Sequence, residues 1–432
     1  MWLVYEVLLL IAFLLYLPSA LWRRRLPHAG WSMRLGRYPR GVIDALRGRR
    51  SLWVHAVSVG EVLAAQPLVR ALANACPDEP LVLSTVTSGG YEVASKQLGD
   101  RGVPMYLPLD LRWCVTRALD TVSPRMLLLV EAELWPTLIR LAKTRGVAIA
   151  VVNGRISARA FRRYRWIKPA TAAMLRHVDL LLMQSQVDAD RVIALGASPG
   201  IVRVTGNLKW DASLGARPSP QAIQQQAARL GLNEHTPLIV AGSTHPGEEE
   251  LVFQAFCALR SSHEGLRLVL APRHLERLAE VEGLVRRTGL TIRHLSQPDA
   301  GSPWDVGLVD TFGQLPFYYG LATVVFIGGS LIPHGGQNPL EAASLGKPIT
   351  FGPFMHNFET IVHQLLAHHA ARQLTGGEQL AGLFQELLAH PTEAQEMGRR
   401  AQALTEQFHG ATQRTLEALR LLLEPTWPKG YG

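Results

Sequence analysis

Two glutamates and a lysine follow short apolar runs of this sequence, where catalytic side chains of α/β proteins commonly lie. Glu61 follows residues 52–57 and a Ser-Val-Gly turn, whereas Glu131 comes directly after residues 126–130. A carboxylate at such a strand end can act as a general base toward a hydroxyl group, or it can only stabilise the next helix. Lys209 lies in a predicted turn after a later strand, where its charge can neutralise a departing phosphate or remain in plain solvent.

Other acidic residues leave their roles open. Glu133 lies two residues after Glu131, and either of them can complete an acid/base pair, bind a metal or cap the next helix. Asp188 and Asp190 form a D-x-D pattern like that of metal-dependent sugar-nucleotide enzymes. They follow a predicted strand where a helix should begin, so we interpret them as helix-capping residues rather than as a metal site.

A glycine-rich segment in the second half of the chain predicts an anion site. Residues 324–353 indicate a strand, a loop, a helix and a strand, and the helix is expected to begin near Asn338 because Pro339 suits a first turn. Free N–H groups at that start would attract a nucleotide phosphate. The Glu341 carboxylate can accept a hydrogen bond from a ribose hydroxyl group. The alternative is a βαβ loop that is rich in glycine without this role.

Further strand ends are expected to lie at the same edge. Arg273 follows the predicted strand 266–270, and its guanidinium group suits phosphate. The strand 237–241 also ends in a glycine-containing turn, and residues 309–315 form another turn that can contact a base or ribose. Carboxyl ends of parallel strands share one edge, so these segments together predict one nucleotide-binding rim.

Length and charge limit the possible classes. A chain of 432 residues predicts two domains, with a linker expected over residues 213–220. The net charge of +9 suits a membrane surface or a phosphorylated substrate. No nucleic-acid-binding module is recognisable, so we expect no nucleic-acid partner. The three cysteines form neither a metal-binding spacing nor an even disulfide set, which favours a reducing compartment.

The N-terminus predicts a membrane anchor. Residues 2–17 are apolar except for Glu6, and the stretch reaches the length of a spanning helix only when extended to Trp22. Arginines follow it and none precedes it, so the body of the protein is expected on the cytoplasmic side. An interfacial helix and a buried core helix are alternatives. The arginine-rich residues 155–168 form either a solvated helix face or a surface for acidic lipid.

Taken in order, these segments resemble the 3-deoxy-D-manno-octulosonic acid (Kdo) transferases of lipopolysaccharide synthesis over nearly the whole chain. The resemblance rests on the apolar N-terminus and on six short motifs: HAVSVGE (55–61), EAELWP (131–136), GNLK (206–209), STH (243–245), PRH (272–274) and GGQNPLEAA (335–343). The sequence differs from the family pattern at Ala132, where threonine is usual, and at Gln314, where glutamate is usual.

The resemblance implies an α/β fold of the GT-B glycosyltransferase type, with two Rossmann-like domains facing a cleft and an N-terminal membrane-anchor helix. We expect the anchor over residues 1–22, an acceptor-binding domain over 23–212 and a domain for the CMP-sugar over 221–400. A final helix over 401–432 can return to the first domain.

The resemblance also implies an inverting, metal-independent transfer of Kdo from CMP-Kdo to the lipid A precursor lipid IVA. The reaction would need no cofactor and would take place at the cytoplasmic side of the inner membrane. Carried over residue by residue, it makes Glu61 the general base, with Glu131 and Lys209 stabilising the transition state. The residues expected to contact CMP are Pro272, Arg273, Phe312, Gly313, Gln314, Asn338, Pro339, Leu340 and Glu341.

Two other functions remain as alternatives. A sugar-nucleotide epimerase of the same architecture would explain the nucleotide rim, but it has no need of an anchor or a lipid-facing basic stretch. A non-catalytic, membrane-tethered protein that binds nucleotide or lipid would keep the fold without the reaction.

Overall fold

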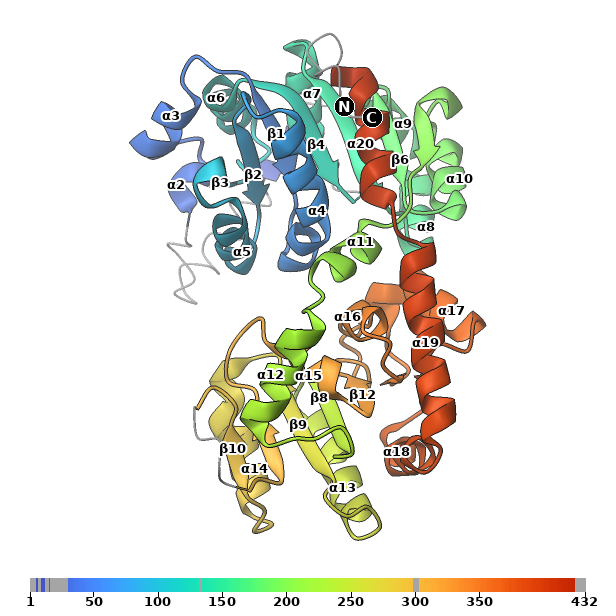
Figure 1. Ribbon diagram of the computed structural model, residues 1–432. Coiled ribbons are helices and arrows are strands. Elements are labelled where there is room, and N and C mark those ends of the chain that lie inside the picture. The colour runs from blue at the N-terminus through green and yellow to red at the C-terminus, as the bar shows by residue number, and fades with distance from the viewer. Residues whose placement is uncertain are drawn as a thin grey trace. The chain divides into compact units, whose positions relative to one another are not determined.

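The computed structural model describes residues 5–6, 9–11, 15, 30–131, 134–297 and 303–423. The chain forms two compact units (Figure 1). The first comprises Met1–Ala212 and Gly410–Gly432, and the second comprises Ser213–His409. Helix α11 (Leu208–Gly215) spans the boundary, so the segment without regular structure before α12 is shorter than the predicted linker.

The first unit is built on a seven-stranded, wholly parallel sheet in the order β3-β2-β1-β4-β5-β6-β7. The order reverses between β1 and β4, which is where open α/β sheets bind ligands. The strands are β1 (Ser51–His55), β2 (Leu81–Thr85), β3 (Gly102–Tyr106), β4 (Pro124–Val130), β5 (Ala148–Gly154), β6 (Leu180–Met183) and β7 (Val202–Val204).

Helices cover both faces of this sheet (Figure 1). Alternation along β1 sends Leu52 and Val54 into one apolar cluster and Trp53 into the other, so both faces are buried. The helices before the boundary are α2 (Trp31–Arg34), α3 (Arg40–Leu46), α4 (Val59–Ala75), α5 (Ser88–Leu98), α6 (Arg112–Val122), α7 (Pro136–Thr144), α8 (Ala158–Trp166), α9 (Lys168–Leu175) and α10 (Gln186–Ala194).

The second unit contains another parallel sheet of seven strands, in the order β10-β11-β9-β8-β12-β13-β14. Here the order reverses between β8 and β12. The strands are β8 (Leu238–Thr244), β9 (Arg267–Pro272), β10 (Ile292–His294), β11 (Val306–Leu308), β12 (Val324–Ile327), β13 (Ile349–Phe351) and β14 (Arg372–Gln373).

Apolar residues of the second unit pack between the sheet and its helices, with Phe256, Phe326 and Phe384 fully buried in one cluster. The helices are α12 (Pro220–Leu230), α13 (Glu248–Arg260), α14 (Leu278–Arg286), α15 (Leu315–Leu321), α16 (Leu340–Ser344), α17 (Glu359–Ala367), α18 (Leu380–Ala389) and α19 (Pro391–Gln407).

The end of the chain returns to the first unit. Helix α19 runs without a break through residue 401, and the last helix, α20 (Ala411–Leu423), packs against α4. Leu419 and Leu423 of α20 join the same apolar cluster as Leu52 and Val54.

The predicted anchor over residues 1–22 lies mostly outside the described residues. Among those described, the Tyr5 hydroxyl group donates a hydrogen bond of 3.0 Å to Asp110, and Glu6 lies 3.3 Å from Arg140 of α7. No helix within the described part of the chain has the length and apolar character needed to cross a bilayer.

Candidate active site

Glu61 lies in the first turn of α4, directly after β1, as predicted. The half-buried carboxylate accepts the Val57 backbone N–H at 2.8 Å through Oε2, and the Ser58 hydroxyl group at 3.0 Å through Oε1. Two local donors therefore fix the carboxylate at the carboxyl edge of the sheet. A glutamate carboxylate is a base and can accept a proton from a hydroxyl group.

Glu131 follows β4, the strand that pairs directly with β1. The strand ends at Val130, and Glu131 adopts a left-handed backbone with a φ of 62°. Its N–H donates to the Val152 carbonyl at 2.9 Å. Glu61 and Glu131 thus follow the two strands that flank the reversal of strand order. Glu133 lies outside the described residues.

Lys209 lies 3.1 Å from Glu131, measured from Nζ to Oε1, and both side chains are mostly buried. The structure corrects one detail, because Lys209 lies in the first turn of α11 rather than in a turn before a linker. A chain of amides holds this turn: Asn153 accepts the Leu208 N–H at 2.9 Å, and Asn207 donates to Gln184 at 2.9 Å.

Sequence reasoning missed the role of His55, which belongs to the same motif as Glu61. His55 is fully buried at the end of β1, and its Nε2 accepts the indole N–H of Trp135 at 3.1 Å. An indole N–H can only donate, so the imidazole proton lies on Nδ1, where it donates to Ser84. Burial lowers the pKa of His55 to about 4 and keeps the ring neutral.

This neutral histidine should make folding sensitive to acid. The unfolded His55 takes up a proton below its ordinary pKa of 6.5, whereas the folded one resists protonation down to about 4. Stability from this residue is therefore complete above pH 6.5 and decreases as the pH falls toward 4, by up to about 1.4 kcal/mol per pH unit. We expect a His55→Gln variant to lose less thermal stability over this range than the wild type.

Comparing the wild type with the His55→Gln variant separates the effect of His55 on stability from the effect of Asp110, which has the opposite sign. Burial raises the pKa of Asp110 to about 6, so this residue favours the folded state as the pH falls through that value. Asp110 is present in both proteins and cancels in the difference. Parallel curves of melting temperature against pH would contradict the prediction.

In the second unit, the predicted strand ends do lie along one edge, because β9, β8 and β12 are consecutive parallel neighbours. Pro272 ends β9 and is buried, whereas the Arg273 side chain is exposed. Burial raises the pKa of Glu341, which lies beyond β12, and the positive charge of Arg273 acts against this shift. Arg273 makes no ion pair with any described residue, so its guanidinium group is available for an anion.

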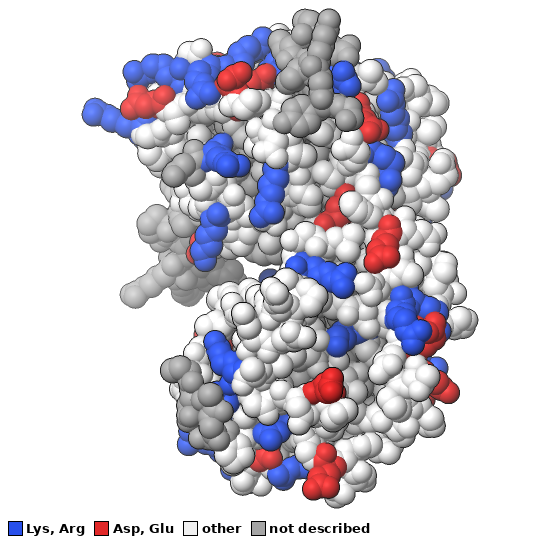
Figure 2. Space-filling model, viewed as in Figure 1, with Lys and Arg blue, Asp and Glu red and all other residues white. Residues whose placement is uncertain are grey.

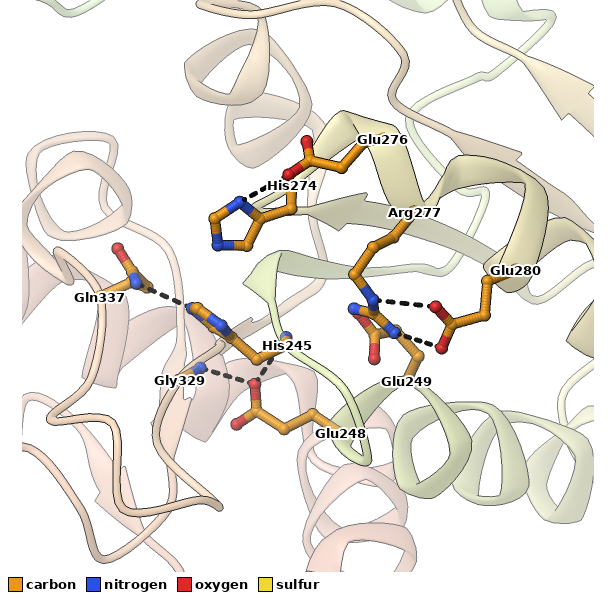
Figure 3. Close-up of polar contacts among 9 residues, drawn as sticks. All are labelled: His245, Glu248, Glu249, His274, Glu276, Arg277, Glu280, Gly329 and Gln337. Carbon is orange, nitrogen blue, oxygen red and sulfur yellow. Dashed lines mark hydrogen bonds and ion pairs between the residues drawn. The ribbon is translucent and has the colours of Figure 1, made fainter. Parts of the chain in front are cut away.

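In the glycine-rich loop after β12, Glu248 of α13 accepts three backbone N–H groups, a contact that the sequence did not predict. Figure 3 shows this contact at Gly329. Glu248 is completely buried and accepts from Gly329 at 2.6 Å and from Ser330 and Leu331 at 2.9 Å each. It also accepts the His245 N–H at 3.0 Å. The buried Glu248 carboxylate thus holds the loop after β12 through hydrogen bonds to its backbone.

The helix predicted near Asn338 begins later. Helix α16 starts at Leu340 and has only five residues, with Pro339 in the capping position. The Asn338 side chain accepts the Leu340 N–H at 3.1 Å, so this donor is already occupied. Glu341 lies in the first turn, as predicted. Burial raises the pKa of Glu341, while the Asn338 side chain and the Arg273 charge act in the opposite direction.

Three residues predicted to contact CMP lie after β11. Phe312 is 73% exposed, an unusual state for a large aromatic side chain and one that leaves its ring available for stacking. Gly313 has a φ of 80°, which favours glycine. Gln314 precedes α15 as its capping residue.

His245 is a further rim residue that sequence reasoning did not assign. Its Nε2 accepts from the Gln337 amide at 3.1 Å (Figure 3). The rings of His334 and His274 have centroids 4.0 Å and 5.8 Å from that of His245. Burial, followed by these neighbours and Arg273, lowers the pKa of His245 to about 4. The rim therefore combines a neutral histidine with exposed cationic or ionisable groups.

The structure confirms Asp188 as an acidic residue of a helix start, but the capping side chain there is that of Ser185. Asp188 lies in the first turn of α10 and is buried. Its Oδ1 accepts the Ile156 N–H at 2.8 Å, and its Oδ2 accepts the Ser185 hydroxyl group at 2.5 Å. Its oxygens thus hold the start of a helix.

Comparisons of sequence identify relatives over most of the chain. A family model described as 3-deoxy-D-manno-octulosonic-acid transferase (kdotransferase) matches residues 29–212. A 3-deoxy-D-manno-octulosonic acid transferase of Haemophilus influenzae is 32% identical over 378 residues, covering 87% of this chain and 88% of that protein. One from Bordetella pertussis is 35% identical and covers 85% and 86%, respectively.

Comparisons of structure agree on the fold. A glycosyltransferase from Rickettsia africae has a TM-score of 0.57 and 11% identity, covering 88% of this chain and 100% of that one. The UDP-GlcNAc 2-epimerase of Neisseria meningitidis has a TM-score of 0.58 and 14% identity, covering 86% and 100%. At such identities the likeness concerns only the fold, two parallel-sheet α/β domains of the GT-B type. The sequence relatives are closer, and by them the chain belongs to the 3-deoxy-D-manno-octulosonic acid transferase family.

Proposed function

We propose that this protein transfers Kdo from CMP-Kdo to a hydroxyl group of lipid IVA, the acylated and phosphorylated precursor of lipid A. The observation that carries the proposal is the pairing of β1 with β4, which brings Glu61 and the Glu131–Lys209 pair to one sheet edge. The second unit would hold the donor, and the first would act on the acceptor.

In this mechanism Glu61 is the general base. A sugar hydroxyl group is a weak nucleophile, so Glu61 takes its proton while the new bond to the anomeric carbon of Kdo forms. Val57 and Ser58 hold the carboxylate in place for this transfer. Glu131 and Lys209 would stabilise the transition state, in which the sugar ring carries positive charge and the leaving group becomes negative.

The bond between the anomeric carbon and the phosphate oxygen breaks as the new bond forms, and CMP leaves as an anion. Arg273 would receive the phosphate charge, because its guanidinium group is exposed beside the nucleotide rim. Phe312, Gly313 and Gln314 would contact the nucleotide from the β11 side. The segment from Asn338 to Glu341 would contact it from the β12 side.

We further propose that the protein works at the cytoplasmic side of the inner membrane. Helix α8 supports this, because its arginines are exposed and Trp166 at its end is 89% exposed. An exposed tryptophan beside cationic side chains suits a membrane interface with anionic lipid. On the face drawn in Figure 2, basic and acidic side chains are both present and lie scattered over the surface.

Mass spectrometry of the lipid product tests the proposed reaction. Purified protein incubated with CMP-Kdo and lipid IVA should yield lipid heavier by one or more Kdo residues, together with CMP. We expect the same yield in the presence of a metal chelator. Unmodified lipid would contradict the proposal, and an epimerised sugar nucleotide formed without any lipid would favour the epimerase instead.

A further inference from the structure

The turn that carries Glu131 needs external support. Its φ of 62° lies in the left-handed region, which costs a residue with a side chain about 1–2 kcal/mol. At the start of the turn, the Glu131 N–H donates to the Val152 carbonyl. Beyond it, the first N–H groups of α7 at Thr137 and Leu138 donate to Asp110 at 2.9 Å and 2.8 Å. Hydrogen bonds therefore fix Glu131 and the start of α7, on either side of residues 132–133, which lie outside the described part of the chain.

Between these points, the side chain of Trp135 provides a third attachment. Its indole N–H donates to Nε2 of His55, and the two rings meet edge to face at 69° with centroids 6.1 Å apart. His55 is in turn held by Ser84 of β2, through contacts of 2.9 Å to the hydroxyl oxygen and 3.1 Å to the carbonyl oxygen. The turn after β4 is thereby tied to β1 and β2.

We infer that His55 is a positioning residue for the transfer reaction. By accepting the Trp135 N–H, it holds the turn in the left-handed conformation that directs the Glu131 carboxylate to Lys209. The inference rests on the role proposed above for Glu131. It adds that His55, in the motif HAVSVGE, acts through Trp135, in the motif EAELWP. Their hydrogen bond therefore links the segment of the proposed base, Glu61, with the segment of Glu131.

A Trp135→Phe variant tests this inference, because it keeps an aromatic ring and removes only the N–H donor. A small displacement of a catalytic group is enough to slow a reaction, so we expect kcat to fall about 10- to 100-fold. The KM values for CMP-Kdo and lipid IVA should stay within about twofold of the wild type, because the turn does not bind substrate in this scheme.

A double-mutant cycle with Glu131→Gln separates positioning from general loss of structure. If Trp135 acts through Glu131, adding Trp135→Phe to Glu131→Gln should lower kcat by less than about twofold further. His55→Gln, which keeps an acceptor for the indole, should retain more activity than His55→Leu.

Trp304→Phe is the matched control. Trp304 also donates its indole N–H to a single acceptor, the Leu230 carbonyl at 3.0 Å, but it is buried, whereas Trp135 is half-buried, and it lies in the second unit. We expect a similar loss of thermal stability with kcat unchanged. An unchanged kcat in Trp135→Phe would overturn the positioning role of His55. So would an equal loss of kcat when Trp135→Phe is made in the wild type and in Glu131→Gln. Either result would leave the proposed transfer reaction standing. Full activity of Glu131→Gln would instead reject the proposed role of Glu131.

Discussion

A Glu61→Gln variant is expected to lose about 10²- to 10⁴-fold in kcat while it binds CMP as well as the wild type. The amide cannot accept the proton of the acceptor hydroxyl group at neutral pH. It can nevertheless keep the local structure, because its oxygen can accept the Val57 N–H while its NH₂ group donates to the Ser58 hydroxyl oxygen. The loss should therefore reflect chemistry rather than misfolding.

Kinetics of Kdo transfer and calorimetry with CMP measure the two effects separately. Glu92→Gln serves as the control, since Glu92 is an exposed residue of the neighbouring helix α5 and should have no effect on either. Unchanged turnover in Glu61→Gln would remove this residue from the mechanism. Lost CMP binding with intact folding would instead assign Glu61 to the donor.

The sequence predicted much of the first half of the site because its signals are local. A short apolar run, a small-residue turn and a helical apolar pattern together place Glu61 in the first turn of α4, and the structure confirms this position. The same reasoning placed Glu131 directly after β4. The strand order was not predicted, because the pairing of β1 with β4 joins segments more than seventy residues apart.

The details that were wrong depend on contacts between distant segments. Lys209 was predicted in a turn, but Asn153, Gln184 and Asn207 form a buried amide network that starts α11 one residue before it. No local pattern identifies this network. The tie between His55 and Trp135 likewise joins two motifs that are eighty residues apart, and each motif taken alone indicates nothing about the other.

The glycine-rich loop shows the same limit. Its glycines predicted a tight backbone, and Gly335 and Gly336 do have positive φ values of 105° and 76°. The prediction of free N–H groups at the helix start is contradicted at Leu340, whose N–H donates to the Asn338 side chain. The sequence also did not reveal that Glu248, 81–83 residues earlier in the chain than Gly329, Ser330 and Leu331, accepts the N–H groups of these loop residues. A carboxylate at the start of α13 has an ordinary local role as well, so its sequence position did not reveal the second one.

Replacing Glu248 with glutamine should destabilise the second unit and weaken nucleotide binding. Oε1 accepts the N–H groups of Ser330 and Leu331, and Oε2 accepts those of His245 and Gly329. Whichever oxygen becomes an NH₂ group, two backbone donors then face another donor around a fully buried side chain. At about 1–3 kcal/mol for each unsatisfied group, we expect a loss of about 2–5 kcal/mol in the free energy of unfolding.

Because the same bonds hold the loop that leads to Asn338 and Glu341, the affinity for CMP should also fall, by about tenfold or more. Denaturant unfolding and calorimetry with CMP measure the two losses. Glu249→Gln is a close control, since Glu249 is equally buried on the same helix but contacts Arg277, at 2.9 Å, instead of the loop (Figure 3). This control should lose stability and keep its affinity for CMP. Equal affinities for CMP in Glu248→Gln and the wild type would show that the loop keeps its shape without the carboxylate, and the nucleotide rim would then have to be organised by the backbone alone.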